Sequence, residues 1–223
     1  FLIASILSAT GTYNFMLAKW LDEKLKPIST NKFTISDPLR FSEELRTKDI
    51  LDDEILVSYD VSSLFTNVPV DETIEILVQK AFHHEWFNNN YKLALKESDL
   101  RTLLSIAVKN QLFQLDGKLY EQVDGVAIGS PLGPLMANTF MCSIEETLVK
   151  NMDMPSFYHR FVDDTITAQS SLATAEAFLD TLNNCHESLN FTMECEVNGK
   201  LPFLGMEAIR KDNHPETKVH AKP

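Results

Sequence analysis

Three aspartates in this chain have the residue type and spacing needed to bind a divalent cation. Asp163 and Asp164 are adjacent and lie between the apolar runs FYHRFV and TITA, and Asp60 directly follows the apolar run 55–59. Clustered carboxylates repel one another, so their ionised forms are costly to hold together unless a cation neutralises them. Mg²⁺ takes carboxylate oxygens together with substrate phosphates, and two such ions can stabilise both oxygens of a phosphoryl transfer. An ordinary acidic turn is the alternative, because Asp is common in turns.

Hydrophobic periodicity predicts the elements that must position these carboxylates. Helices are expected over residues 11–26, 41–49, 70–87, 99–110, 135–150 and 171–189, with N-cap candidates at Ser42, Ser98 and Ser171. Strands are expected over 55–59 and in three hairpins, around Asp116-Gly117, around Asp163-Asp164, and around Asn198-Gly199 with strands over 191–197 and 200–210. Because the strands come as antiparallel pairs with helices between them, we predict an α+β fold with helices on one face of an antiparallel sheet.

Composition and charge limit the functional classes. The 223 residues are 44% hydrophobic and 23% charged, which is typical of one soluble globular domain, or one and a part. The net charge of −12 argues against a nucleic-acid partner, unless a cleft is locally basic. Three cysteines without a CxxC spacing favour a reducing compartment with inert thiols.

The amino-terminal run is apolar like part of a signal peptide, but we do not expect it to be one. The opening FLIASIL lacks the basic start and the small-residue cleavage site of a signal peptide. No run reaches the roughly 18 apolar residues of a membrane span. We expect no membrane partner, and because the chain begins with Phe and its ending KVHAKP looks cut, we expect an internal fragment of a longer protein.

Four stretches together resemble a known family: LVSYDVSSLFTNVPVDETI, EQVDGVAIGSPLGPLMANTFM, FYHRFVDDTIT and LNFTMECEVNGKLPFLGM. Their order and spacing are similar to the successive motifs of a reverse transcriptase domain, most closely those of Penelope-like retroelements, over residues 55–209. The resemblance implies a right-hand polymerase palm with partial fingers. Residues 1–50 would be a partial fingers region and 51–223 the palm, with a fingers-derived segment and hairpin at about 88–123; the thumb is expected to lie outside this sequence.

The resemblance also implies roles for individual residues. Asp60 matches the aspartate that binds two Mg²⁺ ions, for which Mn²⁺ can substitute, and the carbonyl of Val61 matches the backbone ligand beside it. Asp163 matches the second metal-binding aspartate, and Asp164 its more peripheral neighbour. Phe65 matches an aromatic residue under the sugar that would clash with a ribose 2′-OH; its alternative is a core residue below the cleft.

Two further segments match substrate-binding positions of the family. Gly129, Ser130 and Pro131 match a loop along the incoming nucleotide and template, although the same residues suit a simple helix entry. Lys200 matches a basic residue that would neutralise or protonate pyrophosphate, although a lone Lys beside a turn is often only solvated. The sequence departs from the family at Gly205, where an Asp usually follows LPFL.

The implied activity is RNA-directed DNA synthesis: an RNA template, a DNA primer and dNTPs, with the primer 3′-OH attacking the α-phosphate. Family logic places such a protein in the nucleus. Two alternatives stay open, namely a catalytically inactive retroelement remnant that keeps the palm fold as a scaffold, and a metal-dependent phosphohydrolase. Without the basic fingers segment and the thumb, the fragment supplies few of the phosphate contacts that duplex binding needs, so its activity in isolation is open.

Overall fold

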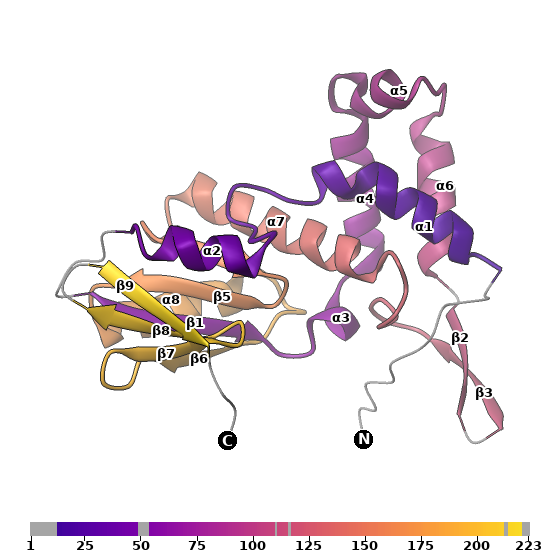
Figure 1. Cartoon of the computed structure of the whole chain (residues 1–223). Helices are drawn as coiled ribbons and strands as arrows, with labels where there is room; N and C mark the ends of the chain where they lie inside the picture. Colours follow the sequence, from indigo (N-terminus) through magenta and orange to yellow (C-terminus); the bar gives the residue numbers. More distant parts are fainter. Residues whose placement is uncertain (1–12, 49–53, 110, 116, 212–213, 220–223) are drawn as a thin grey trace. The chain divides into compact units, whose positions relative to one another are not determined.

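The computed structural model describes residues 13–48, 54–109, 111–115, 117–211 and 214–219. The chain folds as two compact units, each built from two segments of sequence (Figure 1). The helical unit comprises Phe1–Asn31 and Ser63–Ile144, and the sheet unit comprises Lys32–Ser62 and Glu145–Pro223. Each unit contains residues from both sides of the boundary that we expected at residue 50. The assignment of 1–50 to the fingers and 51–223 to the palm stays a prediction.

The sheet unit holds the strands that carry the three aspartates. Its elements are α2 (Pro38–Leu45), β1 (Ile55–Val61), the end of α7 (Gly133–Asn151), β4 (Tyr158–Phe161), β5 (Asp164–Gln169), α8 (Leu172–Cys185), β6 (Phe191–Cys195), β7 (Lys200–Phe203), β8 (Met206–Lys211) and β9 (His214–Val219). A four-stranded sheet has the order β4-β5-β1-β6, and a three-stranded sheet has the order β7-β8-β9. All these pairings are antiparallel.

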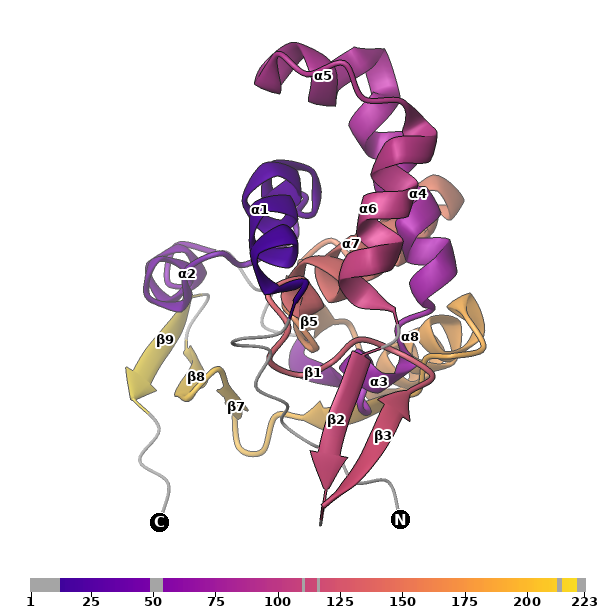
Figure 2. The ribbon, with the colours of Figure 1, turned by 90° about the vertical axis from the view of Figure 1, so that its right-hand side faces the viewer.

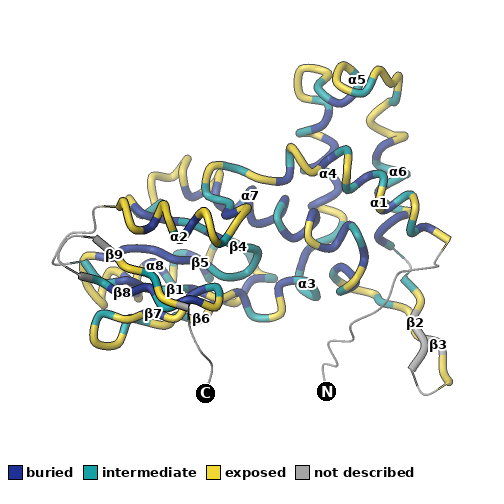
Figure 3. Tube along the Cα trace, viewed as in Figure 1, coloured by how far each residue is buried: buried dark blue, intermediate teal, exposed yellow. Residues whose placement is uncertain are grey.

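Strand β1 is an inner strand of the four-stranded sheet, and most of its residues are buried, although Asp60 near its end is exposed (Figure 3). Alternate side chains point to opposite faces. Tyr59 faces α8, where its hydroxyl donates to the Ala175 carbonyl at 3.0 Å and its ring meets Phe178 edge-on at 5.4 Å. Leu56 faces the other way, into an apolar cluster with Phe41 of α2 and residues of β5, β7 and β8. The α+β class predicted from the sequence is therefore confirmed, with α2 and the second sheet covering part of the opposite face.

The helical unit is built around α4 and α6, which pack side by side (Figure 2). Its elements are α1 (Phe15–Leu25), η1 (Lys26–Ile28), α3 (Leu64–Asn67), α4 (Val70–Phe82), η2 (His83–Glu85), α5 (Trp86–Tyr91), α6 (Glu97–Val108), β2 (Gln111–Leu115), β3 (Lys118–Gln122) and the start of α7. Arg101 of α6 forms a bidentate ion pair with Glu75 of α4, at 2.5 and 2.8 Å. None of the helices within the described ranges has both the length and the apolar character that crossing a membrane requires.

The predicted hairpin around Asp116-Gly117 forms as the two-stranded sheet β2-β3, paired from Gln111↔Gln122 to Leu115↔Lys118. Gly117 has φ +75°, which suits the tight two-residue connection. Asp116 lies outside the described residues.

Two of the three predicted N-caps are wrong. Helix α2 begins at Pro38, because the carboxylate of Asp37 caps it by accepting from the backbone N–H of Leu39 at 2.9 Å. Proline at the first helical position favours this start, and Ser42 lies inside the helix. Helix α6 begins at Glu97, so Ser98 is in its first turn rather than at the cap. At the start of α2 both Asp37 and Ser42 are residue types that can cap, and local pattern alone did not rank them.

The third predicted N-cap is confirmed. The hydroxyl of Ser171 accepts from the backbone N–H of Thr174 at 3.2 Å, and the Thr174 hydroxyl accepts from the Ser171 N–H at 3.0 Å. This reciprocal pair starts α8.

The hairpin predicted around Asn198-Gly199 is only a turn. Both residues have positive φ, 54° and 72°, and Val197 and Lys200 exchange backbone hydrogen bonds of 2.9 and 3.1 Å. Beyond that single pair β6 joins the four-stranded sheet and β7 joins the other. The strand predicted over 200–210 is also broken, because the chain reverses at Leu204-Gly205, with φ of 50° and 73°. Because apolar residues continue through this second turn, the sequence pattern did not reveal it.

Candidate active site

Asp163 and Asp164 lie at a strained turn between β4 and β5. The turn residues are Val162 and Asp163, and Asp164 is the first residue of β5, one position earlier than the hairpin predicted from the sequence. We call Phe161–Asp164 the Asp turn. Val162 has φ +57°, which is unusual for a β-branched residue, and Asp163 has no positive φ. A positive φ at the first turn residue only is the φ pattern of a type II′ turn, and backbone strain of this kind concentrates at functional sites.

Asp60 lies opposite the Asp turn on the neighbouring strand. In the antiparallel pairing of β1 with β5, Asp60 and Asp164 are direct partners. The backbone N–H of Val61 donates to the carbonyl of Asp163 at 3.3 Å, which ties the turn to the end of β1. Direct partners project their side chains on the same face, with Cβ atoms about 4.5–5.5 Å apart. The fold thus brings together three acids that are far apart in the sequence.

The proximity of these acids changes their protonation. Burial raises the pKa of Asp164 to about 6, and the neighbouring charges of Asp163 and Asp60 act in the same direction. Burial also raises the pKa of Asp60, with a further contribution from Asp163. The site therefore holds negative charge that the surrounding protein does not fully compensate, and a cation would relieve it.

Asp60 and Asp164 open on a cavity of about 540 Å³ within the sheet unit. Ser58, Thr192 and Glu194 contribute from β1 and β6, and the β7–β8 turn closes the other side with residues 202–206. This volume is within the range of small-ligand sites. One wall of the cavity is acidic and the other is largely apolar. A ligand with a positively charged part and an apolar part would fit here.

The acidic wall suits a divalent cation that also binds a substrate. Among the residues that the structure describes, no three His, Cys, Asp or Glu side chains are close enough to hold a metal ion by themselves. Mg²⁺ does not need such a cage, because it usually takes one or two carboxylates together with substrate phosphates and water. Asp60 and the two acids of the Asp turn match that donor set, with Val61 in β1 beside them.

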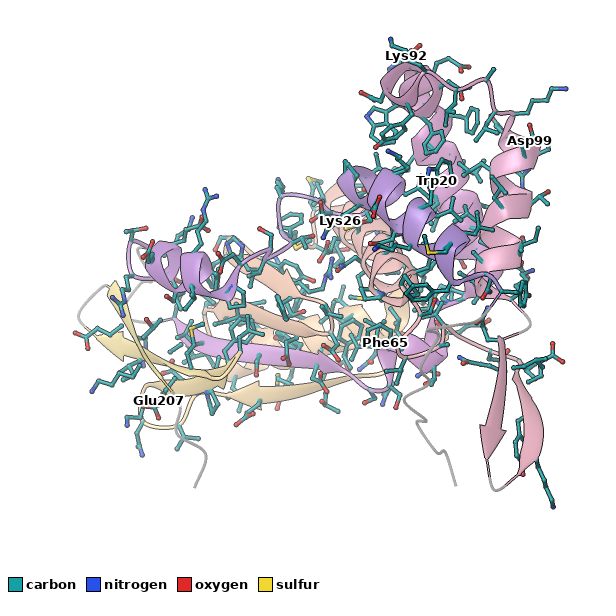
Figure 4. The ribbon with its side chains drawn as sticks, turned by 45° about the vertical axis from the view of Figure 1, so that its right-hand side comes forward. Trp20, Lys26, Phe65, Lys92, Asp99 and Glu207 are labelled. Atoms are coloured by element: carbon teal, nitrogen blue, oxygen red, sulfur yellow. The ribbon has the colours of Figure 1, made fainter. Side chains whose placement is uncertain are left out.

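Phe65 lies in the helical unit, on the short helix α3 (Figure 4). Its carbonyl accepts from the Val126 N–H at 2.8 Å. A Cβ added to Gly125 would come within 2.5 Å of the same carbonyl, and one added to Gly133 would lie 3.6 Å from the Phe65 ring. The glycines of the GVAIGSPLGP stretch therefore let this segment pack directly against Phe65, a role that sequence reasoning did not assign to Gly125 or Gly133.

The predicted nucleotide loop forms the turn before α7. Gly129 has φ +103°, and Ser130 is buried, with its N–H donating to the Ala127 carbonyl at 3.0 Å. The Ser130 carbonyl accepts from the Gly133 N–H at 3.0 Å, and Pro131 lies between them, partly exposed. This geometry suits a helix entry as well as a nucleotide-binding loop, so the substrate role of these residues stays a prediction.

Lys200 begins β7, and the cavity is lined by the other end of this strand. Its ammonium group pairs with Glu207 of β8 at 3.3 Å, and half of its side chain is exposed. A role for Lys200 at pyrophosphate stays a prediction.

Sequence reasoning also missed Arg160, although an arginine inside the apolar run FYHRFV is a visible signal.

The comparison with known proteins decides the family. Residues 10–197 match the family described as reverse transcriptase (RNA-dependent DNA polymerase). The chain belongs to the reverse transcriptase family. Its similar curated relatives include the telomerase reverse transcriptase of Rattus norvegicus, 33% identical over 75 residues that cover 34% of this chain and 7% of the relative. The telomerase reverse transcriptase of Arabidopsis thaliana is 25% identical over a 165-residue alignment that covers 63% of this chain and 14% of the relative.

Solved structures share the fold of this reverse transcriptase domain. Telomerase from Candida albicans, solved with a TWJ fragment of telomeric RNA, aligns with a TM-score of 0.68 at 10% identity, over 93% of this chain and 38% of that one. Apo telomerase from Candida tropicalis, truncated of its C-terminal domain, gives 0.66 at 11% identity, over 95% and 46%. An RNA polymerase complex inside a double-stranded RNA virus gives 0.54 at 10% identity, over 92% and 20%. These neighbours confirm the predicted right-hand polymerase fold.

The raised pKa of Asp164 predicts that neutralising it stabilises the domain. Its folded pKa of about 6 exceeds the ordinary 3.8, so the folded state holds this proton more tightly than the unfolded state. The resulting stability is present below about pH 4 and is lost as the pH rises through 6. Asp164→Asn should therefore raise the melting temperature at pH 7, without divalent cations, by about 2–4 °C, corresponding to about 1 kcal/mol after discounting for solvent screening.

Thermal unfolding followed from pH 4 to 7 measures this effect. The variant should lose less stability than the wild type across that window. Asp180→Asn, on the exposed face of α8, is the matched control and should leave the pH dependence unchanged. Equal pH profiles for wild type and Asp164→Asn would contradict the raised pKa of Asp164, which we attribute to burial and to its acidic neighbours.

Proposed function

We propose that the protein is an RNA-directed DNA polymerase that adds dNTPs to the 3′-OH of a DNA primer on an RNA template. The observation that carries this proposal is the pairing of Asp60 with Asp164 beside Asp163, on the wall of a cavity, in a chain of the reverse transcriptase family. The register of β1 against β5 brings these acids together, because Asp60 is about a hundred residues away from the other two in the sequence.

In this proposal Asp60, Asp163, Asp164 and the carbonyl of Val61 would hold two Mg²⁺ ions, for which Mn²⁺ could substitute. When bound, the ions supply charge neutralisation for the attacking and leaving oxygens of the transfer. Asp164, which the family resemblance makes the more peripheral of the two acids, belongs to the same metal site and contributes mainly to its negative potential. In this proposal the positive φ of Val162 sets the course of the backbone into Asp163 and so orients that side chain.

The wording of the motifs supports a narrower proposal, a Penelope-like retroelement reverse transcriptase that acts in the nucleus. The stretches VSSLFTNVP, DGVAIGSPLGP and NGKLPFLG carry this similarity. The chain spans only 7% and 14% of the telomerase relatives it matches, so the activity of the whole protein is part of the proposal.

Primer extension by the full-length protein tests the proposed function. The assay supplies a DNA primer on an RNA template, the four dNTPs and Mg²⁺, with a matched DNA template and rNTPs as comparisons. We expect extension that requires the divalent cation and prefers dNTPs. No extension with either Mg²⁺ or Mn²⁺ would overturn the proposal and favour an inactive scaffold.

Phe65 gives a separate prediction about sugar selection. Phe65→Val shortens the side chain that we assign under the sugar, so a 2′-OH should meet less steric resistance. We expect discrimination against rNTPs to fall about 10- to 100-fold, the range that pocket size usually controls. Phe65→Tyr keeps the ring and should keep the discrimination. If both variants select dNTPs like the wild type, Phe65 is only a packing residue against Gly133.

A further inference from the structure

A fully buried ion pair lies in the sheet unit, between the end of α7 and strand β4. The side chains of Arg160 and Glu145 both have 0% exposure. The guanidinium is bound at two points, with Nε donating to Oε1 at 2.6 Å and Nη2 donating to Oε2 at 3.3 Å. The hydroxyl of Tyr158 also donates to Oε1, at 3.2 Å. Burial raises the pKa of Tyr158 well above its ordinary value, so this hydroxyl keeps its proton and stays a donor.

The same guanidinium reaches the Asp turn. Nη1 of Arg160 donates to the carbonyl of Val162 at 3.0 Å. Val162 is the residue with positive φ, and its carbonyl belongs to the peptide that leads into Asp163. Arg160 therefore connects a fixed carboxylate on a helix with the peptide unit that orients an acid of the site.

The backbone of Arg160 is held as firmly as its side chain. Its N–H donates to the Phe33 carbonyl at 2.9 Å, and its carbonyl accepts from the Ile35 N–H at 2.7 Å. On its other side β4 pairs with β5, where Arg160 is the partner of Thr165. The residue is thus fixed in the sheet from both edges, so its side chain can act as a rigid support.

Stability alone does not account for an ion pair at this place. Replacing a buried pair by well-packed apolar residues is often neutral or stabilising. An apolar pair, however, could not donate a hydrogen bond to the Val162 carbonyl. Strained backbone persists only where its surroundings over-determine it, and Arg160 supplies such a constraint on one side of the Asp turn.

We propose that Arg160, held in place by Glu145, is a positioning residue that fixes the Val162 carbonyl and thereby aims Asp163 and Asp164 at the site shared with Asp60. This inference rests on the proposed polymerase function. Arg160 acts through the Asp turn, so it should govern cation binding and the rate of the chemical step more than nucleotide affinity.

Three variants of the full-length protein separate positioning from folding. Arg160→Met combined with Glu145→Leu removes both charges and refills the space, so the fold should survive. Arg160→Lys keeps the charge but loses the two-point binding of Glu145. Arg210→Met is the matched control, because Arg210 also donates two hydrogen bonds to a glutamate of the sheet unit, from Nε and Nη2 to Oε1 of Glu196 at 3.0 and 2.7 Å, outside the Asp turn.

Two measurements apply to each variant: single-turnover nucleotide insertion, and Mn²⁺ binding by electron paramagnetic resonance with Asp163→Asn as the baseline. We expect the double variant to insert nucleotides about 100-fold more slowly and to bind Mn²⁺ about 10-fold more weakly, as for other residues that orient metal ligands. Its dNTP dissociation constant should change less than about twofold, since uniform binding contacts are untouched. Arg160→Lys should fall between, and Arg210→Met should match the wild type.

A double variant that melts like the wild type and keeps its insertion rate and Mn²⁺ affinity would overturn the inference. Equal losses in Arg210→Met would also overturn it, because they would show a general effect of destabilising the unit. If the wild type itself inserts no nucleotide, the proposed function fails, and Mn²⁺ affinity alone then decides the inference: weaker binding in the double variant supports positioning, and unchanged binding overturns it.

Discussion

Asp163→Asn in the full-length protein is expected to lower the rate of nucleotide addition by about 10³-fold or more, as for other groups that stabilise transition-state charge. The amide has nearly the shape of the carboxylate but lacks the charge that holds a hard cation. The Asp turn should keep its fold, because the contacts described for it involve the Val162 and Asp163 carbonyls rather than the Asp163 side chain. Single-nucleotide primer extension under single-turnover conditions measures the rate, and circular dichroism checks the fold.

The ranking of the three acids sharpens this expectation. Asp60→Asn should lose as much activity as Asp163→Asn, since both acids are assigned to the ions. Asp164→Asn should lose less activity and gain stability, which separates its role from theirs. Asp180→Asn, exposed on α8, should retain the wild-type rate. An Asp163→Asn variant that adds nucleotides at the wild-type rate would contradict the polymerase mechanism but not the assignment of the fold.

Glu145→Ala is expected to destabilise the protein by about 3–5 kcal/mol, the typical cost of leaving one partner of a buried ion pair uncompensated. The change removes the acceptor of two guanidinium hydrogen bonds from Arg160 and one hydroxyl hydrogen bond from Tyr158. Because whole domains are stable by only about 5–15 kcal/mol, much of the margin would be lost. Urea unfolding should show a lower midpoint with an unchanged slope.

Glu146→Ala provides the matched control for this loss. Glu146 is the next residue of α7 and is exposed, whereas Glu145 is fully buried. The control should change stability by less than about 0.5 kcal/mol, as surface substitutions usually do. Similar midpoints for the two variants would mean that the buried pair contributes nothing to folding.

Local unfavourable features gather around the Asp turn. Val162 adopts a positive φ, and the pKa of Asp164 is raised by its burial and by its acidic neighbours. Proteins commonly break local rules of this kind at functional sites and compensate elsewhere. The buried Arg160–Glu145 pair, the strand pairing on both sides of Arg160 and the bond from Val61 to Asp163 are the compensating contacts.

The sequence by itself determined the features that depend on neighbouring residues. The helical period predicted α4, α7 and α8, and the Ser171 cap was right because a hydroxyl three residues before Thr174 is a local signal. The residue types singled out the three acids as candidates, and the resemblance of the four motifs to a known family implied the polymerase fold. Where two local signals competed, as with Asp37 and Ser42, the prediction chose the wrong cap.

Only the tertiary structure decided which distant residues meet. The pairing of Asp60 with Asp164, the separation of β6 from β7 after a good hairpin turn, and the bond between Glu145 and Arg160 all depend on strand register and packing. Register is set by which face of each strand is buried against the rest of the molecule. Periodicity and turn propensity are properties of a short segment, so they place an aspartate on a strand but cannot say what lies opposite it.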